Sequence, residues 1–229
     1  MKQVFIISGL AFSLAVARAD LVLQQNIQGA MMNGTVTTQI KGNQVRVDMP
    51  STPQGPVSTI MDLSSGDQVM LAHQQRVAMK VPGATVRQMV ENMRKARANA
   101  GTNAPNPQFT DTGKTEKVGD YTAEVYTWSN SNGMHQTVWV AKNFPDYAKI
   151  KVQMDKLNNS PFAQVSKGST PDVSQLPGMV VKSELEKDGQ KVTSTLASVK
   201  EQTVDASLFE APKDYQQMIQ PDAGSPPNQ

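Results

Sequence analysis

The sequence predicts an α+β fold in which a mostly antiparallel β-sheet is interrupted by two helices. Three observations predict this class. Apolar and polar residues alternate along most of the chain, an Asp-Gly turn signal joins two such stretches, and two segments repeat their apolar residues at helical spacing. We expect one domain over 20–218, preceded by an export segment over 1–19 and followed by a disordered tail over 219–229.

The first nineteen residues have the pattern of a cleavable signal peptide. Lys2 precedes an apolar run from Val4 to Val16, and Ala17-Arg18-Ala19 is the small-x-small pattern that signal peptidases cut. The run is too short to span a bilayer core of about 30 Å. We therefore expect cleavage after Ala19, a monomeric protein in the periplasm or outside the cell, and no membrane-spanning segment.

Charge and cysteine content exclude several classes of partner. The export segment contains Lys2 and Arg18, so its removal leaves 20 of the 22 basic residues, which balance the 20 acidic ones. A neutral chain lacks the basic surface of a nucleic-acid-binding protein and the attraction to anionic lipid headgroups. The chain has no cysteine, which excludes disulfides and a lipid anchor at the cleavage site, where Asp20 stands.

Strand signals dominate two regions of the chain. Period-two alternation predicts four strands between residues 45 and 81, as an antiparallel meander with one buried and one solvated face. Two more strands are expected at Tyr121–Ser129 and Met134–Lys142. Asp188-Gly189 then predicts a tight hairpin turn. The register that follows pairs Leu185 with Val192, Val181 with Leu196, Met179 with Ser198, and Glu186 with Lys191.

Two segments follow helical spacing. The first is expected over Thr85–Ala98, with Thr85 and Gln88 as a capping box. In the second, Pro145–Leu157, apolar residues recur both as in a strand and as in a helix, and Pro145 at the start favours the helix. We expect a polar loop over 101–112, and either a flap or a short helix in the long connection over 158–178.

No catalytic or metal-binding motif is found, and no cofactor is expected. A nucleophilic triad would need His73 or His135 beside a serine in a strained turn, and the Gly-x-Ser-x-Gly motif is missing. Both histidines are expected near solvent, at a strand end and beside a turn. No spacing of histidines suits zinc. The thirteen methionines suggest gap-filling in the core or a pliable apolar cavity; copper(I) at Met31-Met32 or Met89/Met93 is conceivable, but no metal site is predicted.

The C-terminal half resembles a known family. The similarity lies in the stretches 133–142, 144–147, 177–182, 189–191 and 204–215, which include Trp139-Val140-Ala141-Lys142 and Phe209-Glu210-Ala211-Pro212. They resemble an uncharacterised family of exported bacterial proteins of unknown function. That family in turn resembles the LolA/LolB-like periplasmic lipoprotein carriers. The resemblance implies an open antiparallel half-barrel whose concave face is covered by two inserted helices, with a hydrophobic cavity between them.

Two functions are consistent with this sequence. The first is a non-catalytic envelope protein that binds a hydrophobic or acylated ligand, such as a lipid or a lipoprotein acyl chain. The second is a structural or protein-interaction module of the envelope with a filled core, which a structure with no cavity above about 300 Å³ would favour. An exported hydrolase is the least favoured alternative. The expected cavity lining is Met61, Leu71, Met79, Val86, Met89, Val90, Met93, Val140, Tyr147, Ile150, Met154, Val181 and Leu196.

Overall fold

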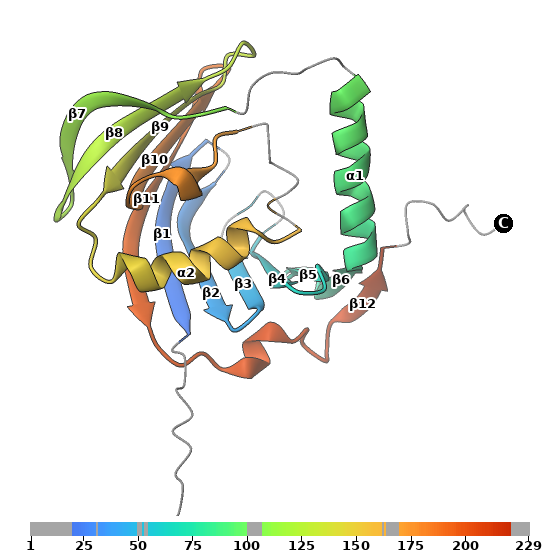
Figure 1. Cartoon of the computed structure of the whole chain (residues 1–229). Helices are drawn as coiled ribbons and strands as arrows, with labels where there is room; N and C mark the ends of the chain where they lie inside the picture. Colours follow the sequence, from blue (N-terminus) through green and yellow to red (C-terminus); the bar gives the residue numbers. More distant parts are fainter. Residues whose placement is uncertain are drawn as a thin grey trace, which may run out of the picture.

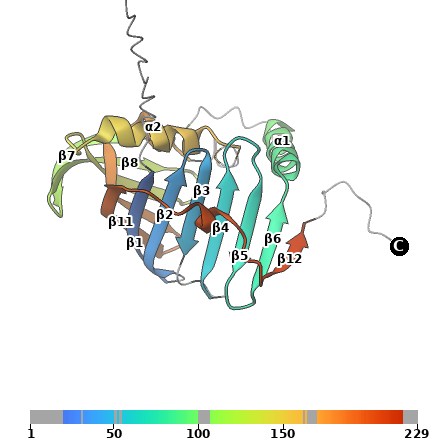
Figure 2. The same cartoon turned by 90° about the horizontal axis from the view of Figure 1, so that it is seen from below.

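A single open sheet of twelve strands forms most of the structure (Figures 1 and 2). The computed structural model describes residues 20–30, 32–49, 52, 55–99, 107–161, 163 and 170–220. The strand order is β12-β6-β5-β4-β3-β2-β1-β11-β10-β9-β8-β7. Neighbouring strands are antiparallel except β12 and β6, which are parallel. The α+β class and the mostly antiparallel sheet are therefore confirmed.

The elements follow one another along the chain with two helices inserted between strands. The strands are β1 (Leu21–Gly29), β2 (Asn33–Lys41), β3 (Gln44–Met49), β4 (Val57–Asp62), β5 (Gln68–Ala72), β6 (Val77–Val81), β7 (Thr110–Val118), β8 (Tyr121–Ser129), β9 (His135–Ala141), β10 (Met179–Lys187), β11 (Gln190–Glu201) and β12 (Gln216–Ile219). The helices are α1 (Gly83–Asn99) and α2 (Tyr147–Asn158), with the 3₁₀ turns η1 (Val173–Gln175) and η2 (Ala206–Phe209).

The β10–β11 hairpin has the predicted turn and, from Lys182 to Lys187, the predicted register. The predicted pairs Val181–Leu196 and Met179–Ser198 lie beyond the paired residues. Asp188 and Gly189 both adopt positive φ, +52° and +74°, which the two-residue turn requires. Glu186 lies opposite Lys191 as predicted. The Lys191 ammonium nevertheless reaches diagonally to Glu184, at 2.8 Å from Oε2. The meander β3–β6 and the pair β8–β9 are also confirmed.

The sequence did not predict β1, β2, β7 or β12. The last two are edge strands, and neither alternates between buried and exposed positions. β7 begins at Thr110, inside the predicted loop, and its residues are exposed as far as Lys117. Every residue of β12 is exposed, and this strand includes Ile219, which had been assigned to the tail. An edge strand needs only one partner for its backbone, so burial does not constrain its side chains. The remaining residues of the predicted export segment, loop and tail (1–19, 101–106 and 221–229) lie outside the described residues.

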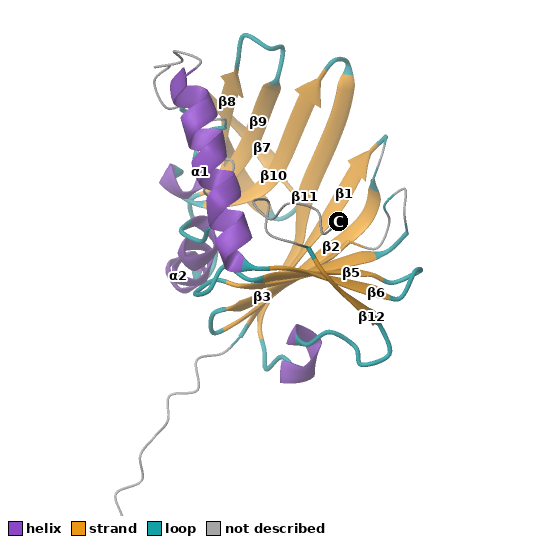
Figure 3. Cartoon of the chain, turned by 90° about the vertical axis from the view of Figure 1, so that its right-hand side faces the viewer, coloured by secondary structure: helices purple, strands orange, loops and turns teal. Residues whose placement is uncertain are grey.

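The sheet bends so that β4–β6 form a floor and β7–β11 a wall, with α2 lying across its inner face (Figure 1). The η2 segment lies on the opposite, outer face (Figure 3). Residues 204–215 cover the outer face of the meander. The solvated face that the sequence predicted is therefore the inner one, at Met70 of β5. The main core contains Leu21, Leu23, Ile40, Val45, Ala123, Val125, Trp139, Ala141, Phe144, Ile150, Met179 and Val181. The outer core contains Val22, Ile60, Leu71, Ala78, Val204 and Phe209.

The two helices differ in how much of their length is packed. Among the residues of α1 whose burial is described, 83–96, only Gly83, Thr85 and Val86 in the first turn are buried. This helix begins two residues before Thr85, and Asp67 Oδ1 accepts the Gly83 N–H at 2.8 Å, so Thr85 is not the predicted cap. The segment beginning at Pro145 does contain the predicted helix, α2, which buries Ile150.

Asp20 joins the two ends of the domain. Its carboxylate is largely buried and accepts hydrogen bonds from Lys41 Nζ (2.8 Å) and the Val204 backbone N–H (2.9 Å). The Asp20 backbone oxygen accepts a further bond from Gln202. The residue that follows the predicted cleavage site therefore fixes the start of the C-terminal segment against β1 and β2.

Asp20→Ala is expected to lower the free energy of unfolding by about 1–3 kcal/mol, because it leaves a buried N–H and a half-buried ammonium without their acceptor. Urea unfolding measures this loss. The control is Asp120→Ala, at the exposed β7–β8 turn, which should change stability by less than about 0.5 kcal/mol. Equal losses in both variants would contradict the assigned role of Asp20.

Candidate functional site: a cavity under helix α2

A cavity of about 260 Å³ lies between α2, η1 and the inner face of the sheet. Leu21, Leu23 and Ile40 from β1 and β2 contribute apolar side chains from the sheet, and Tyr147 and Met154 contribute from the helix. The complete lining is Leu21, Leu23, Gln25, Thr38, Ile40, Gln136, Val138, Tyr147, Lys151, Met154, Asp155, Leu157, Asn158, Val173, Ser174, Gly178, Met179, Val180 and Ser183.

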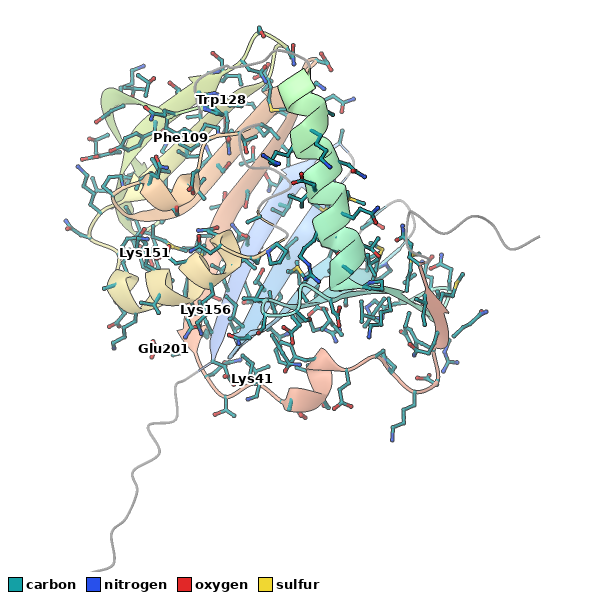
Figure 4. The ribbon with its side chains drawn as sticks, turned by 45° about the vertical axis from the view of Figure 1, so that its right-hand side comes forward. Lys41, Phe109, Trp128, Lys151, Lys156 and Glu201 are labelled. Atoms are coloured by element: carbon teal, nitrogen blue, oxygen red, sulfur yellow. The ribbon has the colours of Figure 1, made fainter. Side chains whose placement is uncertain are left out.

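Charged groups border this cavity on the α2 side. Lys151 and Asp155 form an i,i+4 ion pair at 2.7 Å, and both side chains are more than a third exposed. Their hydrogen bond raises the pKa of Lys151, and burial raises the pKa of the Tyr147 hydroxyl. Lys151 and Lys156 extend from α2 (Figure 4), and Lys156 Nζ bonds the Gly42 backbone oxygen at 3.2 Å. The site therefore combines a mainly apolar interior, which also contains polar side chains such as Gln25, Thr38 and Gln136, with a charged rim.

A second cavity of about 260 Å³ adjoins the first. The two share Gln136, Asn158 and Val173 in their linings. A third, of about 200 Å³, lies at the far side of the Thr170–Gly178 connection, between Phe109 and Tyr126 on one side and Pro171 to Pro177 on the other. The connection holds the predicted short helix, η1. It therefore separates hollows along one face of the sheet.

Tyr126 makes this region sensitive to alkaline pH. Burial raises the pKa of the Tyr126 hydroxyl to about 12, and its hydrogen bond to Glu124 Oε2 (2.8 Å) acts in the same direction. A tyrosine in the unfolded chain ionises near pH 10. The folded state thus holds this proton more tightly, and the resulting stability is complete below pH 10 and lost as the pH rises towards 12.

Tyr126→Phe is expected to flatten the decline of stability between pH 10 and 12. Urea unfolding at fixed pH values measures the free energy, and an absorbance titration of phenolate should lose one group of pKa about 12. Loss of the hydrogen bond shifts the whole curve without changing its slope. The same slope in both proteins would contradict the assignment.

Of the thirteen residues predicted to line a cavity, Tyr147 and Met154 line the one under α2. Met61, Ile150, Val181 and Leu196 belong to or pack against the main core beside it. The other seven lie elsewhere. Leu71 belongs to the outer core, Val140 to a cluster with Tyr126 and Leu176, and Met79 to β6. The remaining four are on α1: Val86 at its buried base, and Val90, Met89 (44% exposed) and Met93 (37% exposed) further along.

On the outer face, His73 lies beside a serine, which the sequence did not predict. His73 Nε2 is 2.7 Å from Ser58 Oγ, and Nδ1 is 2.8 Å from the Tyr215 hydroxyl. Ser58 Oγ donates to Asp48 Oδ1 at 2.5 Å and accepts from Arg46 Nη2 at 3.0 Å. Because the serine has one proton, directed to Asp48, His73 donates through Nε2 and accepts from Tyr215 through Nδ1.

This network closes the outer face instead of presenting a nucleophile. Ser58 is only 1% exposed, and its oxygen has three partners. A catalytic serine needs an oxygen that can reach a substrate. His73 therefore anchors Tyr215 and the C-terminal segment, whereas His135 is exposed beside the β8–β9 turn as predicted.

The described part of the chain carries neither a metal-binding cluster nor a membrane-spanning helix. Within these ranges, no group of three or more His, Cys, Asp or Glu side chains is placed to hold a metal ion. Neither described helix combines the length and the apolar character needed to cross a bilayer.

Comparisons with known proteins identify a family and a shared fold. A family model described as a domain of unknown function (DUF4412) matches residues 21–215, so the family identified from the sequence is confirmed. No protein of curated function matches the chain. An uncharacterized conserved protein from Thermus thermophilus has a similar structure, with a TM-score of 0.52 and 8% identity over 89% of this chain and 92% of that chain.

Two mycobacterial structures are more distantly similar. Lipoprotein LppX from Mycobacterium tuberculosis has a TM-score of 0.40 and 8% identity, over 82% of this chain and 90% of that chain. LprF from Mycobacterium bovis has a TM-score of 0.34 and 9% identity, over 87% and 90%.

Proposed function

We propose a function for this chain, which belongs to the DUF4412 family of unknown function, from the geometry of its own cavity. The protein is a non-catalytic, exported envelope protein that binds an apolar or acylated ligand between α2 and the concave face of a half-barrel. The observation that carries this proposal is the cavity of about 260 Å³ with a mainly apolar interior and a charged rim. An acyl chain suits the interior, and a polar head group suits the rim, where water reaches Lys151.

The cavity volume limits the ligand to a short apolar segment. A water-sized group occupies about 30 Å³, so the space holds roughly eight groups of methylene size. Burying them contributes roughly 6 kcal/mol, which corresponds to a dissociation constant of about 20 µM before any cost of ordering the ligand. We therefore expect medium-chain ligands of modest affinity.

Helix α2 provides a roof that can adapt to a guest. Tyr147, Met154 and Leu157 pack against the main core and also line the cavity. A ligand can replace part of these contacts, since the unbranched methionine side chain repacks easily.

The test is a chain-length series. Saturated carboxylic acids of six to sixteen carbons, below their micellar concentrations, displace a fluorescent fatty-acid probe from the purified protein. Affinity should rise by about 0.8 kcal/mol per methylene and level off near eight or nine carbons. A protein that binds no probe, together with lipid-free protein from its native host by mass spectrometry, would refute the proposal.

The cavity volume also gives specific support to the second candidate, an envelope interaction module. About 260 Å³ is below the 300 Å³ at which ordinary ligand pockets begin. If no acyl compound binds, pull-down from envelope fractions becomes the informative experiment.

A further inference from the structure

Three methionines form a row across the β12 edge of the sheet. Met70 of β5 lies opposite Met79 of β6, and Met79 lies in register with Met218 of β12. Such cross-strand neighbours share a face, with Cβ atoms about 4.5–5.5 Å apart across an antiparallel pair. Met61 of β4 pairs directly with Gln68 of β5, which is two residues before Met70. Met61 is therefore a diagonal neighbour of Met70. The row thus places three methionines at neighbouring register positions on one face, two from the β5–β6 hairpin and one from the C-terminal strand β12.

This row lies on the inner face and is open to solvent. Thr59 of β4 pairs with Met70, so the two side chains share a face. Met61 lies two positions from Thr59 on that same face and packs against the main core, which lies on the inner side of the sheet. Met70 is 39% exposed and Met218 47% exposed. In the part of the chain that the structure describes, four of the eight exposed large hydrophobic residues are methionines, and all four lie on β5, α1 or β12. Half-exposed side chains gain little from burial, so the hydrophobic effect alone gives no reason for methionine here.

We propose that Met70, Met79 and Met218 form a binding site for a soft monovalent cation, Cu(I). Thioether sulfur is a neutral, polarizable ligand that favours Cu(I) over the harder divalent ions. Three unbranched side chains in adjacent register positions can turn their sulfur atoms towards one ion. The thioethers carry no proton at any accessible pH, so binding requires no deprotonation.

The surroundings of the row select against other metals. By strand alternation, the residues beside each methionine on this face lie two positions away. They are Gln68, Ala72, Val77, Val81, Gln216 and Gln220. None is charged or an imidazole, so the row offers neither a carboxylate for Ca²⁺ or Mg²⁺ nor the histidine that Zn²⁺ prefers. It also places no fixed positive charge among these neighbours to repel a cation.

The test is an anaerobic Cu(I) titration of the full protein in competition with a chromophoric Cu(I) chelator, with Ag(I) as a redox-inert second probe. The wild type should bind one equivalent. Met79→Leu removes the central sulfur but conserves apolar volume, and it should weaken binding at least tenfold. Met89→Leu on α1 and Met154→Leu on α2 are controls that keep the row and should bind as the wild type does.

Three outcomes would overturn the proposal. In the first, the wild type binds Cu(I) no more tightly than the Met70→Leu/Met79→Leu/Met218→Leu triple variant does. In the second, Met89→Leu loses as much Cu(I) affinity as Met79→Leu. In the third, Zn²⁺ binds the same three residues with an affinity comparable to that of Cu(I). Circular dichroism confirms that each variant is folded. The ¹³C-methyl NMR signals of the three methionines should shift together on addition of Ag(I), whereas those of Met89 and Met154 should stay in place.

Discussion

Thr38→Trp is expected to weaken the binding of an eight-carbon acyl ligand at least tenfold without unfolding the protein. Thr38 lines the cavity from β2, opposite Leu23, at a position where the sheet holds the backbone in place. An indole at this position occupies the space that the ligand needs. Each methylene that is no longer buried removes about 0.8 kcal/mol of affinity, so losing two or more amounts to a factor of ten. Displacement of the fluorescent probe measures the change.

The matched control is the neighbouring residue, Thr37→Trp. Thr37 lies on the opposite face of β2, beside Gln24 and Asp48, and does not line the cavity. This variant should bind the ligand as the wild type does. Equal weakening in both variants would indicate a general loss of structure, and unchanged binding in Thr38→Trp would place the ligand elsewhere.

Leu71→Ala is expected to lower the free energy of unfolding by about 2–5 kcal/mol. Leu71 is fully buried in the outer core, between the meander and the segment that carries Phe209. Truncation leaves a cavity that this covered face cannot readily fill. For a domain of this size the loss corresponds to a fall in Tm of at least about 4 °C.

Two controls test whether the stability loss in Leu71→Ala comes from the outer core and leaves the ligand cavity unchanged. Leu208→Ala changes a leucine that is 36% exposed in η2, so it should cost less than about 1 kcal/mol. Leu71→Ala should retain acyl binding at temperatures where it is folded, because Leu71 and the cavity lie on opposite faces of the sheet. A small stability loss, or a selective loss of binding, would contradict this placement.

The strands that were predictable are those whose side chains alternate between buried and exposed environments. β8 has the predicted bounds, and the β10–β11 register follows from Asp188-Gly189 because that turn admits few alternatives. β1 and β2 were not predicted, because polar residues such as Gln25 and Thr38 face the interior and break the alternation. β7 and β12 gave no signal, since an edge strand in solvent carries no hydrophobic pattern.

The candidate site was predictable as a type and not as a set of residues. Periodicity identified α2 and therefore Tyr147 and Met154. Periodicity does not reveal which face of the meander a distant segment covers. Leu71 was predicted to line the cavity, but it packs under residues 204–215 on the outer face, and this contact is non-local in sequence. Likewise, the exposed α1 methionines follow helical spacing, yet only the base of that helix is buried. The apolar stretch at the start of β1, Leu21-Val22-Leu23, is three residues long, which is too short to predict a buried strand.

Methyl NMR of the methionines gives the most direct test of the central claim, that an apolar guest enters the space between α2 and the inner face. Met154 and Met179 line this cavity, whereas Met89, Met93 and Met70 are exposed at the other end of the molecule. With octanoate bound, intermolecular NOEs should join its chain to the methyl groups of Met154 and Met179. NOEs to the exposed methionines instead, or none at saturating octanoate, would contradict the account.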